Sequence, residues 1–125
     1  MIKISTEKAP AAVGPYSQAI ISKGMVYTSG QIAIDPRTNT VTAQDIAGQT
    51  EQVMRNLGEV LRTAGSSFGR AVKTTCFLAD MNDFAAFNEV YGKYFTELPA
   101  RSCVAVKSLP KGVLVEVEVI AETDL

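Results

Sequence analysis

Hydrophobic and polar residues alternate along the first part of the chain in short runs that are typical of β-strands. The alternation predicts three strands, over residues 2–5, 17–22 and 25–34. Lys23-Gly24 marks a turn between the second and third strands, and the segment Asp35 to Asn39 is a loop after the third. Strands joined by such short connections are expected to form an antiparallel meander.

Two later segments repeat their apolar residues at helical spacing. From Asp45 to Ala64 the apolar residues recur every three or four positions, and Gly65 is a typical helix stop. The preceding Thr42-Ala-Gln-Asp45 resembles a capping box. A second helix is predicted from Asp80 to Phe95. Its apolar stripe consists of Phe84, Phe87, Tyr91 and Phe95.

Strand-like segments separate and follow these helices, at Ala71–Ala79, Ala100–Lys107 and Val113–Glu122. The order of elements predicts an α+β fold, a two-layer α/β sandwich with two helices on one face of a single sheet. The sheet is expected to be mixed, mostly antiparallel and of about six strands. With no internal repeat or dividing linker, residues 1–125 are expected to form one domain.

The last predicted strand shows what the uncovered sheet face looks like. Valines at alternate positions point to one side, toward the helices, while Leu114, Glu116, Glu118, Ile120 and Glu122 point to the other. A face that is half aliphatic and half carboxylate suits a subunit interface with a polar cleft. The pattern therefore predicts a closed homo-oligomer.

Composition narrows the classes of partner. The formal net charge is -1 and no run of Lys or Arg occurs, so binding to nucleic acid is not expected. No apolar run approaches the length of a membrane span, and MIKISTEKAP has no apolar region of the signal-peptide type. Cys76 and Cys103 lack CxxC spacing and are expected to be reduced thiols. We therefore expect a cytoplasmic protein that does not bind membranes.

The absence of histidine restricts the chemistry most. It excludes a Ser-His-Asp triad, a Cys-His pair and the common histidine-based metal sites, leaving carboxylate, Tyr, Lys or Cys for proton transfer. The sequence contains neither GxxxxGK[ST] nor GxGxxG, so no phosphate or dinucleotide loop is indicated. These features favour a reaction that needs no cofactor and no metal.

Arg101 is the first candidate for the chemistry, because a guanidinium rarely enters a buried strand without a partner. Alternation places it on one face with Cys103 and Ala105, which are small and leave room beside it. One interpretation is a structural salt bridge to Glu116 or Glu118. The other is a forked clamp on the carboxylate of a ligand.

The remaining candidates each have a structural and a functional interpretation. Glu116 and Glu118 fit a solvated sheet face, but one enclosed carboxylate would have a raised pKa and suit a general base. Asn88, on the stripe of the second helix, either bonds to backbone in the core or lines a site. Four further residues belong here. Tyr16 could stand at a cleft edge, and Ser29 and Gly30 fit either a strand end or ligand contacts. For Cys103 a packing role is favoured over nucleophilic attack.

Five segments taken together resemble one known family. They are GPYSQA, TSGQI, NDFAAFNEVYGKYF, PARSCVAV and LPKGVLVEVEVIA, which occur in order over nearly the whole chain. Their combination is similar to that of the RidA family, also called YjgF, the reactive-intermediate deaminases. The resemblance implies a chorismate-mutase-like fold, a homotrimer with clefts between subunits, and metabolite damage control. The implied reaction is cofactor-independent hydrolysis of 2-imino acids to 2-keto acids and ammonia.

The resemblance also assigns roles. It implies that the imines arise from enamines such as 2-aminoacrylate, released by pyridoxal-phosphate-dependent dehydratases. Arg101 would clamp the substrate carboxylate, with the backbone of Cys103 contacting the same molecule, and Glu116 would position or activate water. The cleft-lining positions are matched by Tyr16, Ser29, Gly30 and Asn88.

Three features depart from the family pattern. Ala19 stands where Gly is frequent, Ala105 stands where Glu is frequent, and FTELPARS is short before Arg101. A short rim there would affect the range of substrate sizes and the rate. Some members are credited with regulation, translation inhibition or ribonuclease activity. The alternative function is therefore a non-catalytic module that senses small carboxylates or regulates, or a family member of the translation-inhibitor or ribonuclease type.

Overall fold

The computed structural model describes residues 1–125 and contains ten helices and strands joined by short 3₁₀ turns. In chain order they are β1 (Ile2–Ile4), β2 (Ala19–Ser22), β3 (Met25–Thr28), β4 (Ile34–Asp35), β5 (Thr40–Val41), α1 (Ile46–Thr63), β6 (Ala71–Leu78), α2 (Phe84–Tyr94), β7 (Ala100–Ala105) and β8 (Val115–Glu122). Neither α1 nor any other helix combines the length and the apolar character that crossing a bilayer requires.

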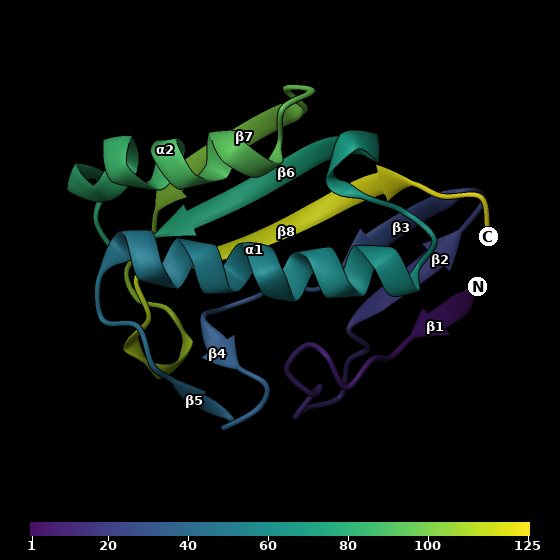
Figure 1. The fold of residues 1–125 in the computed structure, drawn as a ribbon, viewed down its shortest axis with the longest axis horizontal. Coiled ribbons are helices and arrows are strands. Elements are labelled where there is room, and N and C mark those ends of the chain that lie inside the picture. The colour runs from purple at the N-terminus through teal and green to yellow at the C-terminus, as the bar shows by residue number, and fades with distance from the viewer.

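Six strands form the main sheet in the order β1-β2-β3-β8-β6-β7. Every neighbouring pair is antiparallel except β6 and β7, which are parallel and are connected through α2. Both helices lie on the same side of this sheet, with the small β4–β5 hairpin beside α1 (Figure 1). The predicted α+β sandwich, with its mostly antiparallel mixed sheet and its initial meander, is confirmed.

Helix α1 begins after a side-chain cap and ends at a glycine. The carboxylate of Asp45 accepts a hydrogen bond of 2.8 Å from the backbone N–H of Gly48, so Asp45 itself is the N-cap. The predicted capping box that starts at Thr42 is therefore wrong, since Thr42 lies outside the helix. At the other end Gly65 has φ +73°, which satisfies the backbone geometry of a helix stop, as predicted.

The predicted strand 25–34 is too long. Strand β3 ends at Thr28, and of the next five residues only Gln31 pairs with the sheet, through a single bridge to Val117 of β8. The N–H of Ser29 still bonds to the carbonyl of Gln18 at 2.9 Å, which continues the β2–β3 pairing by one residue before the chain leaves the sheet. The β4–β5 hairpin that follows was not predicted, because each of its strands has only two residues.

The two faces of the sheet differ as the alternation in β8 predicts. Val115, Val117 and Val119 are at most 1% exposed and belong to the core beneath the helices. Glu116, Glu118, Ile120 and Glu122 point to the opposite face, which no helix covers. The first three are half-buried and Glu122 is exposed. This uncovered side of the sheet is called the open face below.

Candidate active site

The Arg101 side chain lies on the helix side of the sheet, at the edge strand β7. Its Nη1 donates a hydrogen bond of 2.7 Å to Oδ1 of Asn88 on α2. The guanidinium carbon lies 4.8 Å from the ring centroid of Tyr91 and 5.3 Å from that of Phe84, so both rings make cation–π contacts with it. No other side-chain or backbone oxygen of the chain accepts from Arg101, so its remaining N–H groups are available to a ligand.

The predicted salt bridge from Arg101 to Glu116 or Glu118 is wrong, because strand register places them on opposite faces. Arg101 pairs with Thr74 of β6, and the Thr74 hydroxyl bonds to the phenol of Tyr91 beneath α2 at 2.7 Å. Glu116 and Glu118 alternate with the core valines and point to the open face. One chain therefore separates the two groups that were expected to work together.

Asn88 lies on α2, and its side chain bonds to Arg101 and not to the backbone of the core. It is half-buried, and its side-chain oxygen accepts from Arg101 instead of from a main-chain N–H. The interpretation of Asn88 as a core residue bonded to backbone is therefore wrong. Because an amide oxygen is neutral, it orients the guanidinium without cancelling its charge.

A hollow of about 690 Å³ lies at the other group of predicted residues. Its lining includes Tyr16, Ser29, Gly30, Glu116 and Glu118. The sequence therefore identified residues from three separate segments that the fold brings together. Neither Arg101, Asn88 nor Cys103 lines this hollow.

Glu116 owes its position in the hollow to Gly30. A Cβ atom placed on Gly30 would lie 2.0 Å from Oε2 and 2.8 Å from Cδ of Glu116, so only glycine allows the carboxylate to lie against this backbone. Burial raises the pKa of Glu116, and repulsion from Glu118 raises it further. A carboxylate with a raised pKa is a stronger base than an exposed one, which suits it to accepting a proton from water.

Ser29 and Tyr16 stand at the rim of the same hollow. The Ser29 hydroxyl donates a 2.6 Å hydrogen bond to the carbonyl of Ser17, which ties the end of β3 to the GPYSQ turn. Its proton is thus used within the chain, while its oxygen can still accept. Tyr16 follows this turn and is 52% exposed, so its phenol is free to contact a ligand.

The two cysteines have the properties of packing residues. Burial raises the pKa of Cys76 to about 12 and also raises the pKa of the half-exposed Cys103. A thiol of this kind forms little thiolate at neutral pH and is a poor nucleophile. Cys103 shares the helix-side face with Arg101, so its backbone lies close to the guanidinium along β7.

Sequence reasoning missed several residues of both groups. The hollow is also lined by Gln18, Gln31, Ile32, Ile34 and Lys111. The Pro-Lys-Gly sequence at 110–112 marks a turn but does not indicate that Lys111 lines the hollow. In the structure Lys111 adopts φ +58°, a conformation uncommon for a residue with a side chain. The sequence showed that Phe84 and Tyr91 belong to the apolar stripe of α2. It did not show that the Arg101 guanidinium would pack against their rings, because helical spacing does not indicate which residue of another element contacts the stripe.

A second hollow, of about 720 Å³, lies between α1 and the turn after β4. Its basic residues, Lys8, Arg37 and Arg55, are matched by acidic neighbours, and it contains none of the predicted site residues. No group of three or more Cys, Asp or Glu side chains is placed to hold a metal ion. The residues suited to chemistry are therefore those of the Glu116 hollow and of the Arg101 edge.

Comparison with known proteins places these features in context. A sequence model of the family described as Endoribonuclease L-PSP matches residues 6–123. The chain is 49% identical to a Mus musculus protein named 2-iminobutanoate/2-iminopropanoate deaminase, over 94% of this chain and 88% of that protein. It is 51% identical to a Lactococcus lactis protein with a regulator name, AldR, over 95% of each.

Solved structures share the same fold. The crystal structure of E. coli TdcF with bound serine superimposes with a TM-score of 0.93 at 42% identity, covering 99% of this chain and 100% of that one. Serine is a small molecule with a carboxylate, so one protein of this fold holds such a ligand.

Proposed function

The chain belongs to the Endoribonuclease L-PSP family, which is the RidA/YjgF family, and from this premise we propose that it deaminates reactive 2-imino acids by hydrolysis to 2-keto acids and ammonia. The observation that carries the proposal is the Arg101 guanidinium, which is oriented by Asn88 and has no acidic partner in the chain. Such a group is ready to bind a carboxylate through two parallel hydrogen bonds.

The proposed substrates are unstable imines formed from enamines such as 2-aminoacrylate. Pyridoxal-phosphate-dependent dehydratases would supply them, and their removal would be a form of metabolite damage control. Support for this class comes from the deaminase name of the mouse relative and from the serine bound by TdcF. The reaction requires only orientation and proton transfer, so it needs no cofactor.

In the proposed mechanism Glu116 is the general base. Water attacks the carbon of the protonated imine as the Glu116 carboxylate takes one proton from that water, giving a carbinolamine. Glu116 then returns the proton to the amino nitrogen. The C–N bond breaks and ammonia leaves, while the Glu116 carboxylate takes the hydroxyl proton as the carbonyl forms and passes it to the departing ammonia. The sum is iminium plus water giving 2-keto acid plus ammonium, so atoms and charge balance.

Arg101 and Glu116 of one chain face opposite sides of the sheet, so the proposal requires a second copy. We infer that the chains associate as a homotrimer in which the β7 edge of one subunit packs beside the open face of the next, which brings Arg101 of one subunit to the Glu116 hollow of its neighbour. The half-buried aliphatic and carboxylate residues of the open face support this arrangement, because such a face suits a partly polar interface. Tyr16, Ser29 and Gly30 would contact the substrate from the hollow, and Asn88 and Cys103 from the Arg101 side.

The function is tested by generating a 2-imino acid in situ with an amino acid oxidase and following its loss together with the release of keto acid. The wild-type protein should accelerate the loss well above the spontaneous rate, in proportion to protein concentration. The spontaneous rate in the presence of saturating protein would refute the activity.

The alternative function is a regulatory module that binds a small carboxylate in the same cleft without turning it over. The regulator name of the Lactococcus lactis relative favours it. Titration calorimetry with a stable 2-keto acid separates the two functions, since saturable binding without turnover would support the regulatory one. The ribonuclease name of the family has little support in this chain, because a net charge of -1 gives weak attraction to RNA.

A further inference from the structure

The segment Gly30–Ile34 forms one wall of the Glu116 hollow but is held by very few bonds of its own. Gln31 exchanges backbone hydrogen bonds with Val117 at 2.9 and 3.2 Å, and the N–H of Ile34 bonds to the carbonyl of Ile32 at 2.9 Å. Within 30–33 no other residue pairs with the main sheet. An irregular wall of this kind needs a further anchor to keep one conformation.

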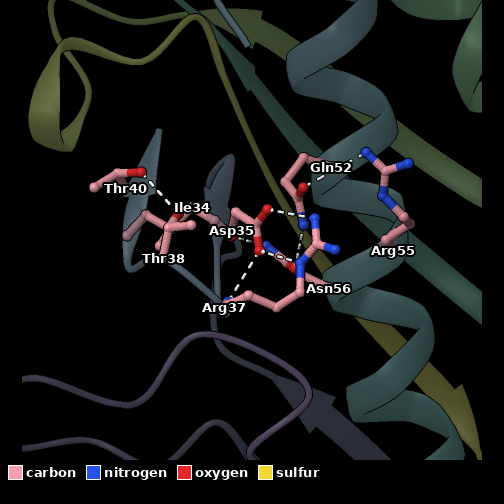
Figure 2. Close-up of polar contacts among 8 residues, drawn as sticks. All are labelled: Ile34, Asp35, Arg37, Thr38, Thr40, Gln52, Arg55 and Asn56. Atoms are coloured by element: carbon pink, nitrogen blue, oxygen red, sulfur yellow. Dashed lines mark hydrogen bonds and ion pairs between the residues drawn. The ribbon is translucent and has the colours of Figure 1, made fainter. Parts of the chain in front are cut away.

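That anchor is the side chain of Asn56 on α1. Its Nδ2 donates to the carbonyl of Ile32 at 3.1 Å and to the carbonyl of Ile34 at 2.9 Å, so both amide hydrogens are used. Figure 2 shows Asn56 and its neighbour Gln52 projecting from α1 toward the Ile34–Asp35 strand. No other side chain hydrogen-bonds to the backbone of residues 30–34.

The orientation of the Asn56 amide is itself fixed. Gln52 donates from Nε2 to Oδ1 of Asn56 at 2.9 Å, which makes Oδ1 the acceptor and leaves Nδ2 for the two carbonyls. Asn56 is 1% exposed and Gln52 is 8% exposed, so water does not replace these bonds readily. Buried carboxamides whose donors and acceptors are all paired hold one geometry strongly.

The polar side chains of α1 form a stripe beside its apolar one. Gln49 lies one turn before Gln52 and two turns before Asn56, and it bonds to the carbonyl of Ala43 and to the N–H of Leu114. The polar side chains of α1 thus hydrogen-bond to irregular backbone in the wall, at Ala43 and at Leu114. By contrast, Asp35 bonds only within its own turn, to Arg37 and to the turn backbone, and does not tie the wall to α1 (Figure 2).

We propose that Asn56 is a positioning residue for the active site: its amide holds the Gly30–Ile34 wall against β8 and thereby keeps the Glu116 carboxylate covered and aimed into the hollow. The link is short. Gln31 bridges to Val117, the residue next to Glu116, and the backbone of Gly30 touches the Glu116 carboxylate. Asn56 lies outside the hollow and acts through the wall. Its effect on catalysis rests on the proposed function.

The test measures the cover over Glu116 directly, by titrating the side-chain carboxyl carbons in protein labelled with ¹³C-glutamate. Within one chain the charged or titratable groups around Glu116 are Glu118 on β8, Lys111 on the turn before β8, and Tyr16 on the opposite rim; the neighbours on β6, Thr75 and Phe77, carry no charge. The proposed assembly adds Arg101 of the neighbouring subunit. Asn56→Leu leaves all of these in place. Its Glu116 resonance should titrate closer to the pH of an exposed glutamate than in the wild type, because the loosened wall admits water.

Two further variants separate positioning from general loss of stability. Leu61→Ala, a core truncation on the same helix, lowers the unfolding temperature without touching the wall and should leave the Glu116 titration unchanged. Gln52→Leu removes the bond that orients Asn56, together with a 3.5 Å bond that Gln52 accepts from the Arg55 guanidinium, so it should shift the titration in the same direction as Asn56→Leu. Gln52→Leu decides the matter if Asn56→Leu fails to fold.

Activity gives a second readout. In the imine assay Asn56→Leu should lower kcat about ten- to a hundredfold with little change in KM, since the Arg101 clamp is supplied by β7 of the neighbouring subunit and is not held by Asn56. A Glu116 titration identical to that of Leu61→Ala, in both Asn56→Leu and Gln52→Leu, would overturn the inference. A wild-type protein without turnover would refute the proposed function instead, and the titration would still decide the role of Asn56.

Discussion

Arg101→Ala will lower kcat/KM for a 2-imino acid by about 10²- to 10⁴-fold. The guanidinium is proposed to make two charge-assisted hydrogen bonds to the substrate carboxylate, each contributing about 1.5–3 kcal/mol, and each 1.4 kcal/mol corresponds to about a tenfold change. The fold should be retained, because Arg101 makes a single hydrogen bond within the chain, to Asn88. Steady-state kinetics on the freshly generated imine measure the effect.

Arg101→Lys is the matched control for charge. Lysine keeps the positive charge but lacks the planar fork, and it stacks less well on Tyr91 and Phe84, so it should recover only a small part of the lost activity. An unchanged unfolding temperature in both variants shows that the loss is local. Wild-type kcat/KM in Arg101→Ala would contradict the assignment of the clamp.

Glu116→Gln will lower kcat by about 10²- to 10⁴-fold, the range that a general base contributes. Glutamine keeps the shape and the contact with Gly30 but cannot accept a proton from water. Stability should not fall with activity. Because the folded-state pKa of Glu116 is raised, protonation favours the fold, and the ionised form at neutral pH opposes it. Removing this charge should leave the unfolding temperature at neutral pH equal or higher.

The pH dependence gives an independent measure of the same residue. Since the base must be ionised, wild-type kcat should rise with pH through the raised pKa of Glu116. Glu118→Gln removes the repulsive neighbour and should move this rise to lower pH, while burial keeps it above that of an exposed glutamate. A Glu116→Gln protein with the kcat and pH profile of the wild type would show that another group takes the proton.

Local pattern was enough to predict most of the fold. The alternation of valines in β8 predicted which face of the sheet the helices cover. Helical spacing predicted α1, and Gly65 predicted its end. Asp45 as the N-cap and the end of β3 at Thr28 were missed, since both depend on which backbone groups find partners after folding.

The candidate site was predicted as a list of residues but not as an arrangement. Tyr16, Ser29, Gly30 and Glu116 meet in one hollow, as the resemblance to the RidA family implied. That Arg101 faces the other side depends on the pairing of β7 with β6 and of β6 with β8, and alternation within one strand does not determine register between strands. Asn56 gave no signal, because a polar residue on a helix is usually solvated.

The central claim is that a complete site joins Arg101 of one subunit to Glu116 of another, and complementation tests it most directly. Arg101→Ala and Glu116→Gln chains are unfolded, mixed in equal amounts and refolded together, and their imine hydrolysis is compared with that of each variant refolded alone. Random assortment should restore about a quarter of the wild-type activity, since that share of interfaces joins two intact residues. Activity no greater than the average of the two separate variants, in mixed oligomers verified by mass, would contradict the account.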